Sequence, residues 1–114
     1  MAKNRMDLIN AEIQKALSHT FTYDIHSEVL NGAIITVTKV DTTNDMKYAK
    51  VYLSIFPDAN KDVVFNNIKQ TIPFLRREVA HNVKLRITPE LHLFLDDSLE
   101  YSQKIDNLLS KINK

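Results

Sequence analysis

Apolar residues recur with a helical period at the start of the chain. Between residues 4 and 18 they stand three or four positions apart, at Met6, Ile9, Ile13 and Leu17, and this spacing places them on one face of an α-helix. Asn4 precedes the run, and an asparagine side chain at such a position accepts a hydrogen bond from a free amide of the first turn. The pattern predicts a helix over residues 4–18, followed by a polar link without a regular period through Asn31-Gly32.

The next two segments have the character of β-strands. Residues 33–40 are rich in β-branched side chains. In residues 48–56, aliphatic side chains alternate with polar or aromatic ones. Turn-forming polar residues fill positions 41–45 between them. We therefore predict an antiparallel hairpin. Its second strand turns four alternate residues toward the core, namely Ala49, Val51, Leu53 and Ile55.

A helical period returns at about Asn60 and lasts to about Asn82. It is carried by Phe65, Ile68, Ile72, Leu75 and Val79. Pro73 lies within this run, and a proline in a helix interior removes a backbone donor and clashes with the preceding turn, at a cost of roughly 3 kcal/mol. Its presence predicts a bend at Thr71-Ile72-Pro73 with helix on both sides.

A strand and a further helix are predicted after this bent helix. The residue before Pro89 is pushed out of the helical region, so we expect residues 84–88 to be extended. Leucines alternate with other residues over 91–95, which predicts a third strand. Asp97 with Glu100 three residues later resembles a capping box. It predicts a last helix that carries Leu99, Ile105, Leu108, Leu109 and Ile112.

The resulting order, α-β-β-α-bend-α-β-α, predicts an α+β fold in which helices cover one face of a three-stranded sheet. A length of 114 residues suits a single domain over 1–114. No apolar run approaches the roughly 18–20 residues that span a bilayer, and the N-terminus lacks the apolar core of a signal peptide. The absence of cysteine fits a reducing compartment. We expect a cytoplasmic monomer without a membrane partner.

Positive charge is concentrated in one part of the chain. Residues 69–86 contain five basic residues and one acidic residue, a net charge of +4, whereas the whole chain carries +1 and the rest therefore −3. Such segregation indicates a polyanionic partner. The candidate phosphate-binding residues are Lys69, Arg76, Arg77, Lys84 and Arg86, with Lys3 and Arg5 as an extension near the first helix. The alternative is that these cations solvate a helix face and pair with Glu78 or Glu90.

Catalytic and metal-binding patterns are weak in this sequence. The four histidines have no ligand-like spacing and no cysteine partners, which argues against a zinc site. There is no Gly-rich phosphate loop and no credible pair of nucleophile and base. Asp96-Asp97-Ser98, with Asp41 or Asp45, would suit metal-dependent hydrolysis, but helix capping and turn formation explain these acids more simply. We expect no cofactor, no small-molecule substrate and no enzymatic activity.

Three stretches resemble the ribosome-binding factor A family, whose members are bacterial assembly factors of the small ribosomal subunit. The first is TVTKV at 36–40, followed after the turn by YAKVYLS at 48–54. The second is FLRREV at 74–79. The third is KLRITPEL at 84–91, which leads into Phe94 and then Asp96-Asp97-Ser98. The order and spacing agree with the family over essentially the full chain.

The resemblance implies a single type II KH-like domain that binds the small subunit and its ribosomal RNA during late maturation, without catalysing a reaction. Family members share an Ala-x-Gly bend between their second and third helices, where this chain has Thr71-Ile72-Pro73. Proline supplies a bend rigidly and has no N–H. The resemblance therefore implies RNA contact through the side chains that flank the bend rather than through its backbone.

A second hypothesis is a protein-interaction module that uses the exposed face of the sheet and has no significant affinity for RNA. The strand faces opposite the predicted core carry Tyr48, Tyr52, His92 and Phe94. Aromatic side chains on a sheet can stack on nucleobases, but more often they form cross-strand pairs that stiffen the sheet. Salt separates the two hypotheses, because phosphate binding weakens steeply with salt and an apolar contact does not.

Overall fold

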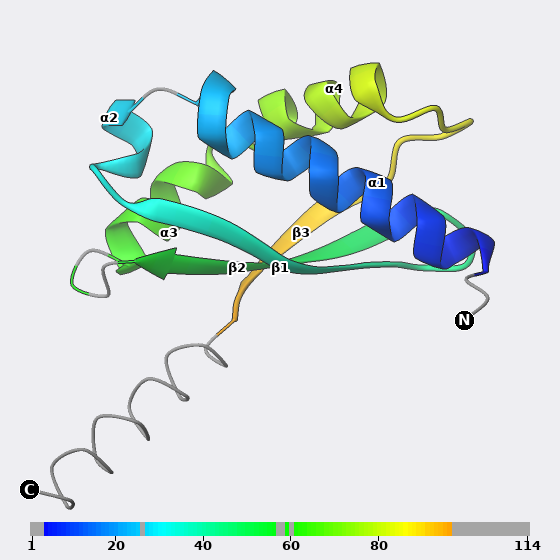
Figure 1. Cartoon of the computed structure of the whole chain (residues 1–114), viewed down its shortest axis with the longest axis horizontal. Coiled ribbons are helices and arrows are strands. Elements are labelled where there is room, and N and C mark those ends of the chain that lie inside the picture. Colours follow the sequence, from blue (N-terminus) through cyan, green and yellow to red (C-terminus); the bar gives the residue numbers. More distant parts are fainter. Residues whose placement is uncertain (1–3, 26, 57–58, 60, 97–114) are drawn as a thin grey trace, which may run out of the picture.

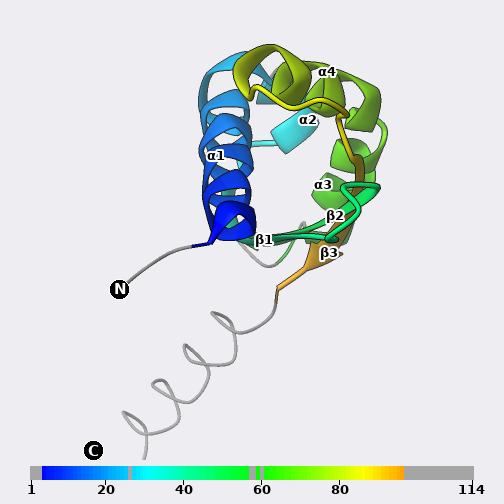
Figure 2. The ribbon, with the colours of Figure 1, turned by 90° about the vertical axis from the view of Figure 1, so that its right-hand side faces the viewer.

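The helices of the chain cover one face of a three-stranded sheet (Figure 1). The computed structural model describes residues 4–25, 27–56, 59 and 61–96. In Figure 2 the strands lie at the bottom of the view, with α1 to the left and α4 above them. This arrangement confirms the predicted α+β fold. The elements, in chain order, are α1 (Arg5–His19), the π-helix η1 (Thr20–Asp24), α2 (Ser27–Leu30), β1 (Ile34–Thr42), β2 (Tyr48–Phe56), α3 (Lys61–Lys69), α4 (Ile72–Asn82) and β3 (Glu90–Leu95).

The sheet has the order β1-β2-β3 and combines two kinds of pairing. β1 and β2 form the predicted antiparallel hairpin, in which Val37 lies opposite Leu53 and the register shifts between Val37 and Lys39. β3 pairs with β2 in parallel, with Leu93 opposite Val51. Parallel neighbours need a long crossover connection, which α3 and α4 provide. The crossover fixes where α4 and its basic residues lie relative to β3.

The core lies between the sheet and the helices. The four alternate residues of β2 that were predicted to face it are all buried, and so are Leu91 and Leu93 of β3. Burial of one such side chain contributes about 1.5–3 kcal/mol, and a slip of one residue would turn the whole row to solvent. These rows therefore set the register. The helices add Ile9, Ile13, Leu17, Val64, Ile68, Leu75 and Val79.

α1 agrees with the helix predicted over residues 4–18 to within one residue. Asn4 has an extended backbone, and its Oδ1 accepts a hydrogen bond from the Asp7 N–H at 2.8 Å. This is the cap that the sequence predicted. The helical period in fact continues past residue 18, because Thr20 and Phe21 are buried three and four residues after Leu17.

The stretch predicted to be a polar link instead forms η1 and α2. For η1 the reason is the hydroxyl of Thr20, which donates to the Ala16 carbonyl at 3.0 Å and so allows a polar residue to occupy a core position. A count of apolar residues misses that position. Ile25 then donates its N–H to the Thr20 carbonyl at 3.1 Å, the wider spacing of a π-helical turn.

The helix predicted to run through Pro73 is broken before it. α3 ends at Lys69, Gln70 and Thr71 form a turn, and α4 begins at Ile72. Thr71 closes the turn through two bonds to the Ile68 carbonyl, from its N–H at 2.8 Å and from its hydroxyl at 2.7 Å. Pro73 lies in the first turn of α4, where the amide that proline lacks would have no helical partner. The cost of a proline in a helix interior therefore does not arise.

Replacing Pro73 should have only a small effect on stability. We expect Pro73→Ala to lower the free energy of unfolding by less than about 1 kcal/mol, because proline at a compatible position acts mainly by restricting the unfolded chain. Denaturant unfolding followed by circular dichroism measures the difference. A gain of about 3 kcal/mol on removing the proline, which is its cost inside a helix, would show a continuous helix under strain.

The remaining predicted elements fall outside regular structure or outside the described residues. Residues 83–89 belong to no strand and form the loop from α4 to β3. The helix predicted from Asp97 onward lies outside the described residues. Within the ranges that are described, no helix combines the length and the apolar character needed to cross a membrane.

Candidate nucleic-acid interface

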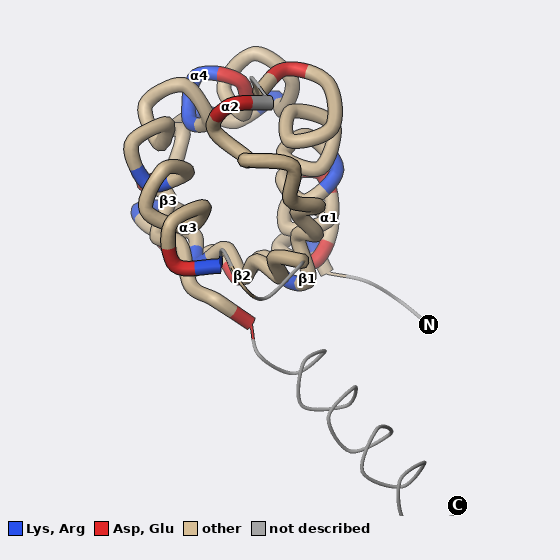
Figure 3. Tube along the Cα trace, turned by 90° about the vertical axis from the view of Figure 1, so that its left-hand side faces the viewer, with Lys and Arg blue, Asp and Glu red and all other residues tan. Residues whose placement is uncertain are grey.

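The basic residues predicted to bind RNA do not form one continuous patch. Lysine and arginine positions occur on α4 and on α1, which lie on opposite sides of the view in Figure 3. Their contacts divide them into separate groups, and Lys3 lies outside the described residues. The groups are Arg76, which bonds to the protein itself, Arg77, which is exposed on α4, the set of Arg5, Lys84 and Arg86, and Lys69 on α3.

Arg76 holds the loop that leads into β3. Its Nη2 donates to the Thr88 carbonyl at 2.7 Å, and its Nε donates to the Pro89 carbonyl at 3.3 Å. Pro89 is fully buried, so the guanidinium fixes the chain at the point where it enters the sheet. The planar fork of arginine suits two neighbouring acceptors. These bonds favour a structural role for Arg76 over direct contact with RNA.

Replacing the guanidinium group of Arg76 should therefore lower the stability of the protein. We expect Arg76→Lys to reduce the free energy of unfolding by about 1–2 kcal/mol, because hydrogen bonds from a charged group contribute about 1.5–3 kcal/mol and this side chain is partly exposed to solvent. Arg77→Lys is the matched control on the same helix and should change stability by less than about 0.5 kcal/mol. Urea unfolding of both variants measures the difference, and equal values would contradict the structural role.

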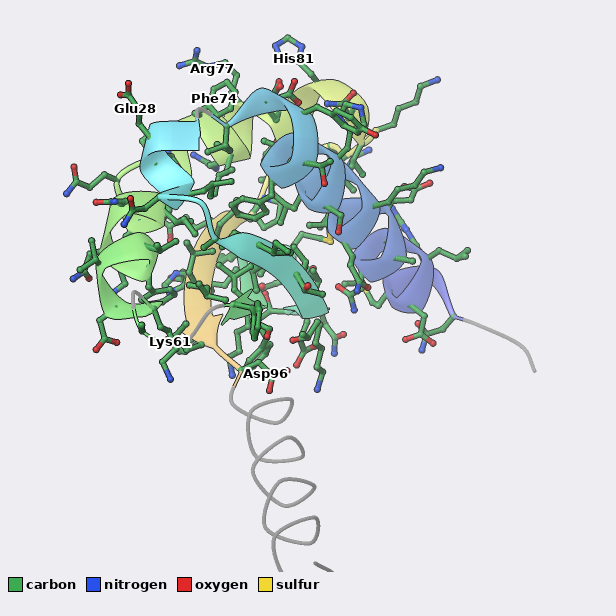
Figure 4. All side chains as sticks on the ribbon, turned by 60° about the vertical axis from the view of Figure 1, so that its left-hand side comes forward. Glu28, Lys61, Phe74, Arg77, His81 and Asp96 are labelled. Atoms are coloured by element: carbon green, nitrogen blue, oxygen red, sulfur yellow. The ribbon has the colours of Figure 1, made fainter. Side chains whose placement is uncertain are left out.

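Arg77 is exposed and lies between two recesses. One has a volume of about 420 Å³ and is lined also by Pro73 and Ala80, and the other has about 500 Å³ and is lined also by Phe74. Figure 4 shows Arg77 on the outer side of α4, close to Phe74. No hydrogen bond or ion pair joins its side chain to another residue of the described ranges. Arg77 is therefore placed to contact a phosphate beside the break between α3 and α4.

Arg5, Lys84 and Arg86 meet in a recess of about 430 Å³, which we call the basic recess. It lies between the start of α1, the β1–β2 turn and the loop from α4 to β3. In the described part of the chain, none of the three cations has a hydrogen-bond or ion-pair partner. Like charges that share a recess repel each other, so a bound anion would relieve the repulsion.

One carboxylate, that of Asp45, also lines the basic recess. It accepts a hydrogen bond from the Thr43 hydroxyl at 2.7 Å and another from the Lys47 N–H at 3.0 Å. These two bonds, the first more than the second, hold the pKa of Asp45 below its usual range. Asp45 therefore stays ionised within the turn. Against three cations it leaves an excess of two positive charges.

Hydrogen bonds between α1 and β1 bring the distant members of the basic recess together. The Thr42 N–H donates to Asn10 Oδ1 at 2.9 Å, and Gln14 Nε2 donates to the Val37 carbonyl at 2.8 Å. They fix α1 against β1, and Arg5 in its first turn thereby reaches the loop from α4 to β3. Sequence reasoning named the three cations and offered Arg5 as an extension of the surface. It did not predict that they meet in one recess, because their meeting depends on how α1 packs.

Lys69 on α3 belongs neither to the basic recess nor to the surface around Arg77. Its Nζ lies 4.9 Å from the centre of the Phe65 ring on the same helix, a cation–π contact. The alternative in which the cations pair with Glu78 or Glu90 is not seen among the described residues, where the carboxylate of Glu90 instead lies 3.9 Å from Nε2 of His92. Phosphate contact is therefore better supported for Arg77 and the basic recess than for Lys69.

The predicted aromatic residues lie on the face of the sheet away from the helices. Tyr52 and Phe94 stack across β2 and β3 with ring centres 5.5 Å apart, and Lys39 Nζ lies 5.8 Å from the Tyr52 ring. Tyr48 and His92 meet edge to face at 5.2 Å. These contacts are cross-strand pairs of the kind that stabilise sheets.

Fold and site together define a class of protein. The sheet is mixed and three-stranded, helices cover one of its faces, and the two helices α3 and α4 connect β2 to β3. This arrangement is a KH-like fold of type II. Basic side chains flank the break and the loop that follows it. The chain belongs to the ribosome-binding factor A family, whose family model, described as ribosome-binding factor A, matches residues 5–109.

Similar proteins of known name agree with this assignment. The ribosome-binding factor A of Clostridium novyi (strain NT) is 44% identical over 115 residues, which cover 100% of this chain and 94% of that protein. The crystal structure of ribosome-binding factor A from Thermus thermophilus has a TM-score of 0.68 at 17% identity and covers 81% of this chain and 97% of its own. A homology model of the Thermus thermophilus factor, fitted into a cryo-electron-microscopy map of a 30S complex, has a TM-score of 0.65 at 19% identity and covers 82% and 97%.

Proposed function

We propose that this protein binds the small ribosomal subunit and its ribosomal RNA during late maturation, as an assembly factor that catalyses no reaction. Membership of the ribosome-binding factor A family supports the ribosome as the partner. The Thermus thermophilus relative fitted into a 30S complex is consistent with the small subunit in particular. The protein would act as a cytoplasmic monomer.

The observation that carries the RNA part of the proposal is the basic recess. Three cations from two distant parts of the sequence face one space. The one carboxylate that lines it within the described residues is already bound to its own turn. Arg5 and Arg86 offer planar forks that match the geometry of phosphate oxygens, and Lys84 adds a point charge. A phosphate of the RNA backbone is the anion that this arrangement fits.

Arg77 provides a second point of contact, in the middle of α4. Arg77 precedes Asn82, the last residue of α4, by five positions, which is about 7.5 Å along the axis at the rise of an α-helix. An RNA strand that touched both points would be held in one position on the protein. The protein would then act by binding one conformation of the RNA and leaving later, with no covalent bond made or broken.

A salt titration of binding to a small-subunit RNA fragment tests the proposal. The logarithm of the affinity should fall linearly with the logarithm of salt. The triple variant Arg5→Gln, Lys84→Gln and Arg86→Gln should reduce the slope by roughly two to three, because each lost phosphate contact changes it by about 0.7–0.9. A matched variant, Lys15→Gln, Lys39→Gln and Lys50→Gln, removes the same charge elsewhere and should keep most of the slope.

The rival protein-interaction module predicts a different result. Contact through the aromatic face of the sheet would depend little on salt, and the variant of the basic recess would then bind as the parent protein does. Equal slopes for both variants, or binding that barely responds to salt, would rule out the basic recess as the phosphate site.

A further inference from the structure

The face of the sheet that turns away from the helices, here called the outer sheet face, is unusually apolar for a free surface. Eight large hydrophobic residues are exposed in the described chain, and four of them lie on this face: Ile34 (65% exposed), Tyr48 (43%), Phe56 (57%) and Phe94 (42%). Half-buried Tyr52 lies between Tyr48 and Phe56 along β2 and stacks on Phe94. A surface that gathers large apolar side chains in this way usually marks a site of contact.

The charges of the outer sheet face do not favour RNA as its occupant. Lys39 lies opposite Tyr52 and Lys50 opposite Asp41, while Glu90 of β3 lies beside His92. The two lysines are thus balanced by two acids, whereas the basic recess has an excess of positive charge. A partner that is apolar and nearly neutral fits this face better than a polyanion does.

The chain itself leaves the sheet at the edge of the outer sheet face. The Asp96 N–H donates to the Leu53 carbonyl at 2.8 Å, and the Thr38 hydroxyl donates to Asp96 Oδ2 at 2.5 Å. Figure 4 shows Asp96 on the side of the sheet opposite the helices. The described chain therefore ends on this side of the sheet, two residues after Phe94.

We propose that residues 97–114 dock on the outer sheet face. Their sequence has apolar residues at helical spacing, Ile105, Leu108 and Ile112, and three acids balanced by three lysines. Eighteen residues at the helical rise extend about 27 Å. The eight-residue separation of Tyr48 and Phe56 along β2 also corresponds to about 27 Å. Charge, length and starting point all match the face.

The docking would remove the exposed apolar side chains of the outer sheet face from water. Each large side chain that becomes buried contributes in the same direction as the core residues do. The proposal concerns a different face from the basic recess and does not depend on RNA binding.

A spin label on the docked segment tests the proposal in the full chain. The sequence has no cysteine, so Lys111→Cys provides a single labelling position in the segment. We expect the label to broaden the NMR signals of Tyr52 and Phe94, with loss of peak intensity, and to leave those of Lys15 on α1 unchanged.

Two further variants separate docking from chance proximity. Adding Ile105→Asp, Leu108→Asp and Ile112→Asp to the labelled chain should restore the intensity of the outer sheet face. Gln103→Asp, Asn107→Asp and Ser110→Asp add the same charge at positions off the apolar spacing and should leave the broadening in place. Equal behaviour of the two triple variants would overturn the proposal.

Two other possible occupants of the outer sheet face, a second copy of the chain and RNA, predict different results. If a second copy covers it, broadening appears when isotope-labelled protein without the spin label is mixed with spin-labelled protein of natural isotope content. If RNA covers it, a small-subunit RNA fragment shifts the Tyr52 and Phe94 signals while the spin label alone has no effect on them. Either result, or no broadening at all, would overturn docking by residues 97–114.

Discussion

Reversing the charge of the basic recess is expected to abolish cosedimentation of the protein with small ribosomal subunits. The variant is Arg5→Glu, Lys84→Glu and Arg86→Glu. A hydrogen bond to a charged group contributes about 1.5–3 kcal/mol, so three of them amount to at least about 4 kcal/mol, or roughly a 1,000-fold loss of affinity. Quantitative sedimentation over a range of protein concentrations measures the loss.

The same variant should fold as well as the parent protein. Arg5, Lys84 and Arg86 are exposed, and none of them has a bonding partner among the described residues. The variant exchanges repulsion among three cations for repulsion among three glutamates and Asp45. All of these charges are at the surface, so the thermal midpoint should change little. Lys15→Glu, Lys39→Glu and Lys50→Glu is the matched control and should retain most of the cosedimentation. If the control loses as much as the recess variant, net charge rather than the basic recess governs binding.

Truncating the centre of the core should have the largest effect on stability. Leu53 is fully buried in the middle strand, opposite Val37 on β1 and Leu95 on β3. Leu53→Ala is expected to lower the free energy of unfolding by about 2–5 kcal/mol, because it removes buried apolar atoms and leaves a cavity. This is a large part of the roughly 5–15 kcal/mol that holds a typical domain folded. Denaturant unfolding provides the measurement.

Ser54→Ala is the control for this substitution. Ser54 is the next residue of the same strand and is only half-buried, so its truncation should change stability by less than about 0.5 kcal/mol. A change at Ser54 as large as that at Leu53 would mean that both faces of the sheet are covered to the same extent.

The strands and the first helix were predictable from the sequence because their patterns are local. Alternation along residues 48–56 gave β2 with its observed bounds, and the run that begins after Asn4 gave α1. In both cases the side chains of one short segment all face the same way. The period of the apolar residues then reports the secondary structure directly.

The break before Pro73 and the two short helices η1 and α2 were harder to predict, for two physical reasons. The apolar period continues from α3 into α4, so only the proline suggested an interruption, and proline in the first turn of a helix looks the same in sequence as proline in its interior. Thr20 occupies a core position with its hydroxyl bonded to the backbone, which an apolar count does not register.

The candidate site was predicted in its residues but not in its arrangement. Charge segregation along the chain named the five cations of residues 69–86, and Lys3 and Arg5 were added as an extension near the first helix. Tertiary packing then decided that Arg76 bonds to the loop before β3, while Arg5 joins two residues about 80 positions away. These are long-range contacts, and no local pattern encodes them.

Photo-crosslinking from two positions tests most directly whether the basic recess faces ribosomal RNA. Ile87 lines the recess and is exposed, whereas Tyr48 is exposed on the outer sheet face. A photoreactive p-benzoylphenylalanine replaces each residue in turn, and each variant is irradiated on immature small subunits. We predict crosslinks to small-subunit ribosomal RNA from position 87 and none from position 48. Crosslinks to that RNA from position 48 alone would contradict the proposed interface.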